Sequence, residues 1–267
     1  MKKLPNFSFV LSFSIAAAVC GISHASAASV ETVMITAFGP WGGNPINLTE
    51  RVAKELKQNE ASLLGEKVRI EVCNLPVEYD RSIVVAKDCF SRLKTKPSLV
   101  ISLGEGGGRV DVELVGANLD GGHADEAGKT NEGKIEAQGP DHVFSTLPIH
   151  LFTTTELQIK DENFLNISED AGDYVCNHNA YLMGKHFAKK RIPYGFVHLP
   201  SFRWSTTDEK AEMLAGHVPA KVSESARVLA NIIKTSLNFY GRGSAKKKLN
   251  QTASSNCKTF QAVSKSN

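Results

Sequence analysis

The chain has 267 residues, of which 42% are hydrophobic, and it carries 31 Lys and Arg residues against 28 Asp and Glu residues. This length and apolar content are sufficient for the core of one domain or at most two. The small net charge of +3 gives no indication of a nucleic-acid-binding surface, and five cysteines are too few for a disulfide-scaffold protein.

Three regions of different composition divide the chain. Residues 1–27 combine the basic pair Lys2 and Lys3 with an apolar run from Phe7 to Cys20, and they end in Ala25-Ser26-Ala27, a cleavage pattern. The apolar run is short for a membrane span, so we expect a cleaved export signal, a periplasmic or secreted protein and no stable membrane association. Residues 241–267 are basic, without acids and with little periodicity, which predicts a disordered tail after a folded domain over residues 30–240.

Signals for strands and helices alternate within residues 30–240. The sequence predicts strands over Val33–Ala37, Val68–Leu75, Ser98–Leu103 and Gly195–Leu199. It predicts helices that begin after Asn47, at Asp80, near Cys176 and after Pro219. This alternation is typical of an α/β fold with a mostly parallel sheet. The polar, glycine-rich residues 121–139 are predicted to form a loop beside the site.

A glycine cluster, Gly104–Arg109, follows the third predicted strand. It begins like a dinucleotide-binding G-x-G-x-x-G loop, but Arg109 replaces the third glycine and the extended segment Val110–Ala117 replaces the helix, so we reject a dinucleotide site. Glycines at the carboxyl end of a strand still allow a ligand to approach the backbone closely.

Cys176 is the candidate nucleophile. It lies at the start of a predicted helix, with Asp173 as a candidate N-cap. A thiol in a first helical turn is near unpaired N–H groups and the positive end of the helix dipole, and both favour the nucleophilic thiolate. A buried structural thiol is the alternative interpretation. A disulfide among Cys73, Cys89 and Cys257 is compatible with an exported thiol enzyme, but the sequence does not select the pair.

Cysteine catalysis also needs an imidazole and a group that orients it. His198, in the predicted strand Gly195–Leu199, is the candidate base, and Glu113, in the extended segment Val110–Ala117, is the candidate orienting group. From the pattern alone, His198 could equally be a core histidine and Glu113 a solvent-facing residue of an alternating strand.

Five stretches of the chain resemble the type I, cysteine-dependent pyroglutamyl peptidase family. They occur in the family's order over roughly residues 31 to 240: Thr36–Gly43 with Asn47, Thr49 and Glu50; Gly104–Arg109 with Glu113, Asn118 and Leu119; Gly139–Pro140 with Leu147–Pro148; Ala171–His178; and Phe196–Pro200. The resemblance implies a single-domain, three-layer α/β/α sandwich with a twisted sheet, and it allows a homo-oligomer.

The resemblance also implies a reaction, the removal of an N-terminal pyroglutamyl residue from peptides through an acyl-enzyme, with no cofactor and no metal. By it, Cys176 is the nucleophile, His198 the general base and acid, and Glu113 the group that orients His198. The residues that it assigns to substrate binding are Phe38 and Trp41, which sandwich the pyroglutamyl ring, and Glu105, Tyr174 and Val175.

The chain departs from the family pattern near the site. Glu105 stands where the family commonly has Gln, and the segment between Arg109 and Glu113 is about two residues shorter than usual. The family's Arg after Asn118-Leu119 is missing, and His123 is the candidate replacement. Two alternatives therefore stay open: a non-catalytic homologue that binds pyroglutamyl peptides, and a cysteine amidase for another small acyl group.

Overall fold

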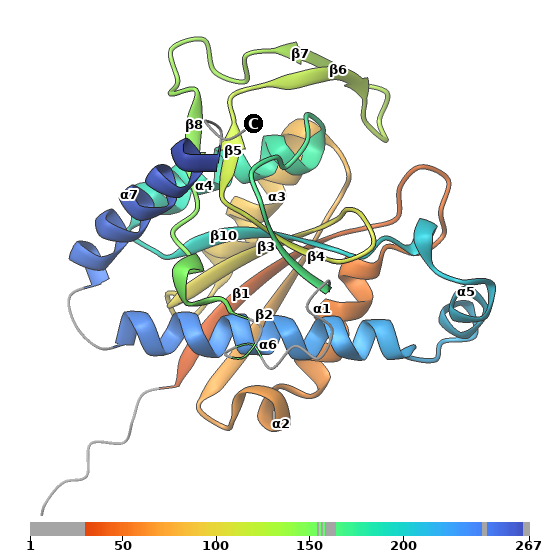
Figure 1. The fold of residues 1–267 in the computed structure, drawn as a ribbon. Helices are drawn as coiled ribbons and strands as arrows, with labels where there is room; N and C mark the ends of the chain where they lie inside the picture. Colours follow the sequence, from red (N-terminus) through yellow and green to blue (C-terminus); the bar gives the residue numbers. More distant parts are fainter. Residues whose placement is uncertain (1–29, 154, 156, 158–163, 242–244, 264–267) are drawn as a thin grey trace, which may run out of the picture.

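A central sheet of six strands carries the fold, in the order β2-β1-β3-β10-β4-β9 (Figure 1). The strands are β1 (Glu31–Phe38), β2 (Val68–Leu75), β3 (Leu99–Glu105), β4 (Val110–Glu113), β9 (Leu165–Ser168) and β10 (Tyr194–Leu199). All neighbours are parallel except β4 and β10, so the prediction of a mostly parallel sheet is confirmed. The computed structural model describes residues 30–153, 155, 157, 164–241 and 245–263, and the predicted export signal lies outside them.

Helices cover both faces of the sheet, which confirms the three-layer α/β/α arrangement (Figure 1). Helices α1 (Leu48–Gln58), α2 (Glu60–Leu64) and α6 (Ala220–Gly241) lie on one face, and α3 (Tyr79–Arg92) and α4 (Val175–Lys190) lie on the other. Within the described residues, no helix combines the length and the hydropathy needed to cross a membrane.

Alternating side chains of β1 connect these two layers. Val33, Ile35 and Ala37 pack with α1 and α6, whereas Met34 and Phe38 pack with α3 and α4. Such alternation follows from the two-residue period of a strand. Both faces are therefore hydrophobic, as expected for a strand buried between two helical layers.

The segment predicted as a loop, residues 121–139, is partly strand, so that prediction is wrong. It contributes to β6 (Asp120–Ala124) and β7 (Thr130–Gly133), which pair antiparallel. Asp125 makes the turn between them, because its Oδ1 accepts hydrogen bonds from the backbone N–H groups of Ala127 and Lys129. A second small sheet pairs β5 (Val115–Ala117) with β8 (His142–Phe144).

The prediction of a disordered tail is also wrong, because Ala245–Val263 forms helix α7. Asn256 is buried on this helix, and its amide donates to the carbonyl oxygens of Ser145, at 2.8 Å, and Leu147, at 3.2 Å. Phe260 contacts the rings of His142 and Phe144 on β8. These contacts, made with residues far away in the sequence, order the segment.

The remaining short elements of the described residues are α5 (Thr207–Leu214), η1 (Ile149–Leu151) and η3 (Phe202–Trp204).

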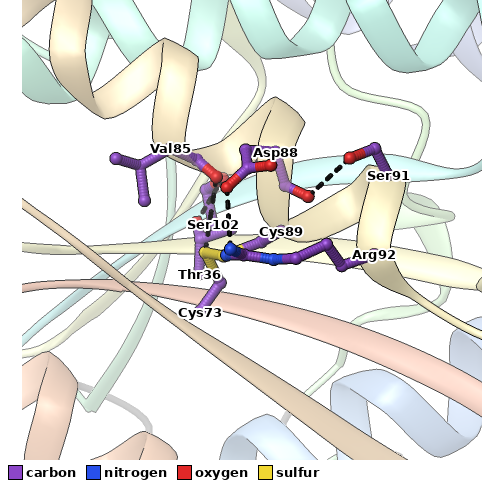
Figure 2. The surroundings of a disulfide bond; sticks show 8 residues. All are labelled: Thr36, Cys73, Val85, Asp88, Cys89, Ser91, Arg92 and Ser102. Atoms are coloured by element: carbon purple, nitrogen blue, oxygen red, sulfur yellow. Dashed lines mark hydrogen bonds and ion pairs between the residues drawn. A yellow bond between two sulfur atoms is a disulfide. The ribbon is translucent and has the colours of Figure 1, made fainter.

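A disulfide joins Cys73 on β2 to Cys89 on α3 (Figure 2). The sequence allowed a bridge among Cys73, Cys89 and Cys257 without selecting the pair, and the structure selects this one. Cys176 and Cys257 are free. Beside it, Arg92 lies 3.8 Å from Cys89 Sγ and pairs with Asp88 at 2.9 Å. The bond closes a short loop and ties α3 to an edge strand of the sheet; a bridge over a loop of about 15 residues stabilises a fold by about 3 kcal/mol.

Candidate active site

Cys176 is the second residue of α4. Tyr174 is the N-cap of this helix and no side chain caps it, so the prediction that Asp173 is the N-cap is wrong. The carbonyl oxygen of Asp173 instead accepts from the N–H of Gly121 on β6, at 2.8 Å. The first N–H groups of α4 therefore have no capping side chain, and together with the helix dipole they favour an anion beside Cys176.

His198 and Glu113 come from the neighbouring strands β10 and β4. The Nδ1 atom of His198 lies 2.8 Å from Oε1 of Glu113, and both side chains are buried, with 11% and 2% of their surface exposed. A carboxylate in this place accepts a hydrogen bond from Nδ1–H and leaves Nε2 of the ring free to interact with a second partner.

The Cys176 thiol is the candidate for that second partner, because Cys176 and His198 line the same cavity and interact electrostatically. Burial lowers the pKa of His198, but the hydrogen bonds and the negative charges of Cys176 and Glu113 outweigh it and raise the pKa to about 10. The raised pKa favours the charged imidazolium form of His198. The structure thus places Glu113, Cys176 and His198 in the lining of one cavity, and their catalytic roles stay a prediction.

Two glycines of the Gly104–Arg109 cluster make room for this arrangement. A Cβ atom at Gly104 would lie 2.9 Å from Cys176 Sγ, and one at Gly106 would lie 2.9 Å from His198 Cβ. Any larger residue would have to push the thiol or the imidazole away. The cluster therefore serves the close approach of catalytic side chains to the backbone, in addition to that of a ligand.

A cavity of about 470 Å³ opens beside Cys176 and His198. Part of its lining is an aromatic and apolar slot, formed by Phe38, Trp41, Val77, Tyr174 and Val175. The ring centroids of Trp41 and Tyr174 are 6.3 Å apart, with an angle of 40° between the planes. Apolar walls with few polar groups fit a small, flat, uncharged ring. Of the predicted binding residues, Phe38, Trp41, Tyr174 and Val175 line this slot.

Glu105 also lines the cavity, but protein groups occupy its carboxylate. Its Oε1 accepts from the N–H groups of Leu48, at 2.6 Å, and Phe202, at 3.1 Å. Its Oε2 accepts from Trp41 Nε1, at 3.2 Å, and Ser201 Oγ, at 3.0 Å. An ionised carboxylate accepts at both oxygens, whereas Gln would present an N–H₂ group to some of these donors. Glu105 thus joins the slot wall to the start of α1 and to the chain that follows β10.

His123, the candidate replacement for the family's Arg, does not line the cavity. Its Nε2 lies 3.6 Å from the carboxylate of Asp173, and 63% of its side chain is exposed. Its ring meets the ring of Tyr174 edge to face, with 6.4 Å between centroids. The N–H of Gly121 in the same strand donates to the carbonyl oxygen of Asp173 at 2.8 Å, so β6 lies beside the residues that precede α4.

Sequence reasoning missed the polar part of the cavity. Asp111, Asn166, Ser168 and Asp170 line it, next to Arg109 and Glu113. The signal was present for Asp111, since Val110–Glu113 alternates apolar and acidic residues. For Asn166 and Ser168, no signal could show that the short strand β9 pairs with β4.

A thiol, an imidazole and a carboxylate that meet beside a slot at the carboxyl edge of an α/β sheet define a cysteine-type hydrolase site. The sequence profile of the pyroglutamyl peptidase family matches residues 31–225, and the chain belongs to this family of cysteine-type peptidases.

Individual relatives agree with this assignment. The chain is 31% identical over 179 residues to a pyrrolidone-carboxylate peptidase of Brevibacillus brevis, a match that covers 64% of this chain and 79% of that protein. It is 36% identical over 175 residues to pyrrolidone-carboxylate peptidase 2 of Caldanaerobacter subterraneus, covering 63% and 80%. A solved structure of a mutant pyrrolidone carboxyl peptidase from Pyrococcus furiosus is 28% identical, with a TM-score of 0.64 and coverage of 78% and 99%. Assembly into a homo-oligomer stays a prediction.

Replacing Glu113 by Gln should lower the rate of pyroglutamate release by about a hundredfold to ten-thousandfold, because the imidazole loses the group that orients it and stabilises its positive charge.

The same substitution should also change how the stability of the fold depends on pH. The pKa of His198 is raised from 6.5 to about 10 in the fold, so its protonation stabilises the fold fully below the unfolded value and ceases to do so as pH rises through the folded one. The Tm difference between wild type and variant should therefore be larger near about pH 6 than near about pH 10. Glu78→Gln, which changes an exposed ion pair, is the control, and a pH-independent difference for Glu113→Gln would contradict this account.

Replacing Glu105 by Gln should raise KM for a pyroglutamyl substrate by about tenfold and change kcat less, because a donor among Trp41, Leu48 and Phe202 loses its acceptor. If Glu105 acts by fixing Trp41, the same substitution should raise KM less in a Trp41→Phe background than in wild type. Steady-state kinetics of the four proteins measure this coupling. Independent, additive effects would show that Glu105 does not position Trp41.

Proposed function

We propose that Cys176, His198 and Glu113 carry out the removal of an N-terminal pyroglutamyl residue from peptides. The observation that supports this most directly is the placement of His198, whose Nδ1 lies 2.8 Å from the Glu113 carboxylate and whose ring lines the same cavity as Cys176, beside the apolar slot. Family membership supports the substrate class, and the geometry supports the role that we propose for each side chain.

In the first half of the reaction, the Cys176 thiolate attacks the pyroglutamyl carbonyl carbon and forms a tetrahedral intermediate. The N–H groups at the start of α4 carry no capping side chain, and they are the donors for its oxyanion. His198 then gives its proton to the leaving amine, the C–N bond breaks, and the pyroglutamyl group remains on Cys176 as a thioester.

In the second half, the now neutral His198 takes a proton from water, and the resulting hydroxide attacks the thioester. The C–S bond breaks, free pyroglutamate leaves, and the thiolate and imidazolium pair is restored. Glu113 keeps its charge throughout and stabilises the imidazolium whenever it forms.

The slot also accounts for selection of a blocked N-terminus. A pyroglutamyl group carries no ammonium, so its site needs no free carboxylate. Glu105 borders the slot through its hydrogen bond from Trp41, and both of its oxygens are occupied by protein donors. A free N-terminal ammonium in this slot would be desolvated without a partner, which is costly.

Release of free pyroglutamate from a pyroglutamyl amide reporter should be abolished by Cys176→Ala and by thiol alkylation. Cys257→Ala is the matched control and should keep full turnover, because Cys257 lies on α7 and does not line the cavity. Binding of a pyroglutamyl peptide without turnover would instead support the non-catalytic homologue. Faster turnover of another small acyl amide would support a different cysteine amidase.

The same proposal includes export. The leader over residues 1–27 supports it, as does the Cys73–Cys89 disulfide, because such bonds persist in oxidising compartments and are rare in the cytosol. N-terminal sequencing of the protein purified from its native source should give a chain that begins just after Ala27. A mature chain that still begins at Met1 would contradict export by this leader.

A further inference from the structure

The polar part of the cavity lining begins with alternate residues of strand β4. Val110 and Val112 point into the core shared with α1 and α6, so Asp111 and Glu113 point to the opposite face and line the cavity. Asp111 is also the register partner of His198 across the antiparallel β4–β10 pair.

Strand β9 extends this polar surface. It pairs parallel with β4, with Asn166 opposite Asp111 and Ser168 opposite Glu113. Leu165 and Ile167, the alternate residues, pack against the core on the other face. We call the cavity surface formed by Asp111, Asn166, Ser168 and Asp170 the polar floor.

The polar floor has unused acceptors. Asp111 Oδ1 accepts from Arg109 Nε, at 3.1 Å, and from Asn166 Nδ2, at 2.8 Å, while Oδ2 has no hydrogen-bond partner among the described residues. Asp170 likewise uses Oδ1, which accepts from the N–H of Gly172 at 2.8 Å. At the inner edge of the floor, Oε2 of the buried Glu113 has no partner within the part of the chain that the structure describes.

The charges on this side of the cavity do not balance. Asp111 and Asp170 carry two negative charges, and Arg109, whose side chain is 49% exposed, supplies one positive charge. The His198 imidazolium is shared between the Glu113 carboxylate and Cys176, so it leaves no positive charge for Asp111 or Asp170. The polar floor is therefore net negative, with carboxylate oxygens available to a ligand.

The floor lies on the leaving-group side of the reaction. The apolar slot takes the acyl ring, and His198 delivers its proton to the amine that leaves. Since Asp111 is next to His198 across β4 and β10, the chain beyond the broken bond extends over the polar floor.

We propose that the polar floor is the subsite for the residue that follows pyroglutamate, and that it favours a basic side chain there over an acidic one. This inference rests on the proposed function. A Lys or Arg side chain would reach the open carboxylate oxygens of Asp111 and Asp170, whereas a Glu side chain would meet like charges.

The test compares two substrates that differ only at that residue, pyroglutamyl-lysine amide and pyroglutamyl-glutamate amide. We expect kcat/KM for the lysine peptide to be about tenfold higher at low salt, with the ratio falling as salt screens the charges. Asp111→Asn should lower the ratio toward one, and Arg109→Gln, which removes the opposing cation, should raise it. Asp141→Asn removes an exposed carboxylate that does not line the cavity and should leave the ratio unchanged.

The ratio of two substrates on one variant cancels any general loss of activity that a substitution in β4 causes. Turnover of both peptides at equal rates, a preference for glutamate, or a ratio that neither variant changes would overturn the subsite while leaving the peptidase intact. If neither peptide is turned over, the proposed function fails. Equilibrium binding of the same two peptides to Cys176→Ala then decides the subsite, with equal affinities counting against it.

Discussion

The contact between Glu113 and His198 is the interaction on which the site depends. Both groups are buried, and a buried charge is tolerated only when a partner compensates for lost hydration. Sheet topology supplies that partner. The chain leaves β3, crosses the end of β10 through Gly106–Arg109 and returns as β4, antiparallel to β10. This crossing brings a carboxylate next to the imidazole, and the missing side chain of Gly106 lets it pass over His198.

Two buried glutamates at this edge of the sheet have different tasks because their surroundings differ. Four donors hydrogen-bond to Glu105, so its carboxylate fixes the slot wall and the chain after β10 in place. Glu113 receives one hydrogen bond, from His198, and keeps an oxygen without a partner. The charge of Glu113 is thus directed at the imidazolium, where it helps to raise the pKa of His198 against the effect of burial.

The strands and helices of the central layers could be predicted from the sequence because their signals are local. Val68–Leu75 alternates and stops before a proline, and it is the strand observed. Contacts between distant segments could not be predicted in this way. Asn256 orders α7 by pairing with carbonyl groups more than a hundred residues earlier, within a segment whose composition is typical of disorder.

The residues of the site show the same difference between what local sequence signals predict and what only tertiary contacts decide. Glu113, Cys176 and His198 were assigned through a family resemblance, since spacing alone left core and surface interpretations open. His123 was a candidate replacement for the missing Arg, and its sequence neighbours do not reveal that its ring lies beside Asp173 and not in the cavity lining. The polar floor was missed because it requires the register of β9 on β4, which depends on tertiary pairing of two short strands.

Helix α7 lies beyond residues 31–225, the part that the family profile matches. Its Asn256 occupies backbone acceptors beside β8, and Tyr240 of α6 hydrogen-bonds to Thr146 in the same region. The packing of this chain therefore continues past the range that the family profile matches. A recombinant version that ends before Ala245 would leave the carbonyl oxygens of Ser145 and Leu147 without their Asn256 donor and Phe144 without Phe260, so expression work should retain the chain through Val263 and place any affinity tag after it.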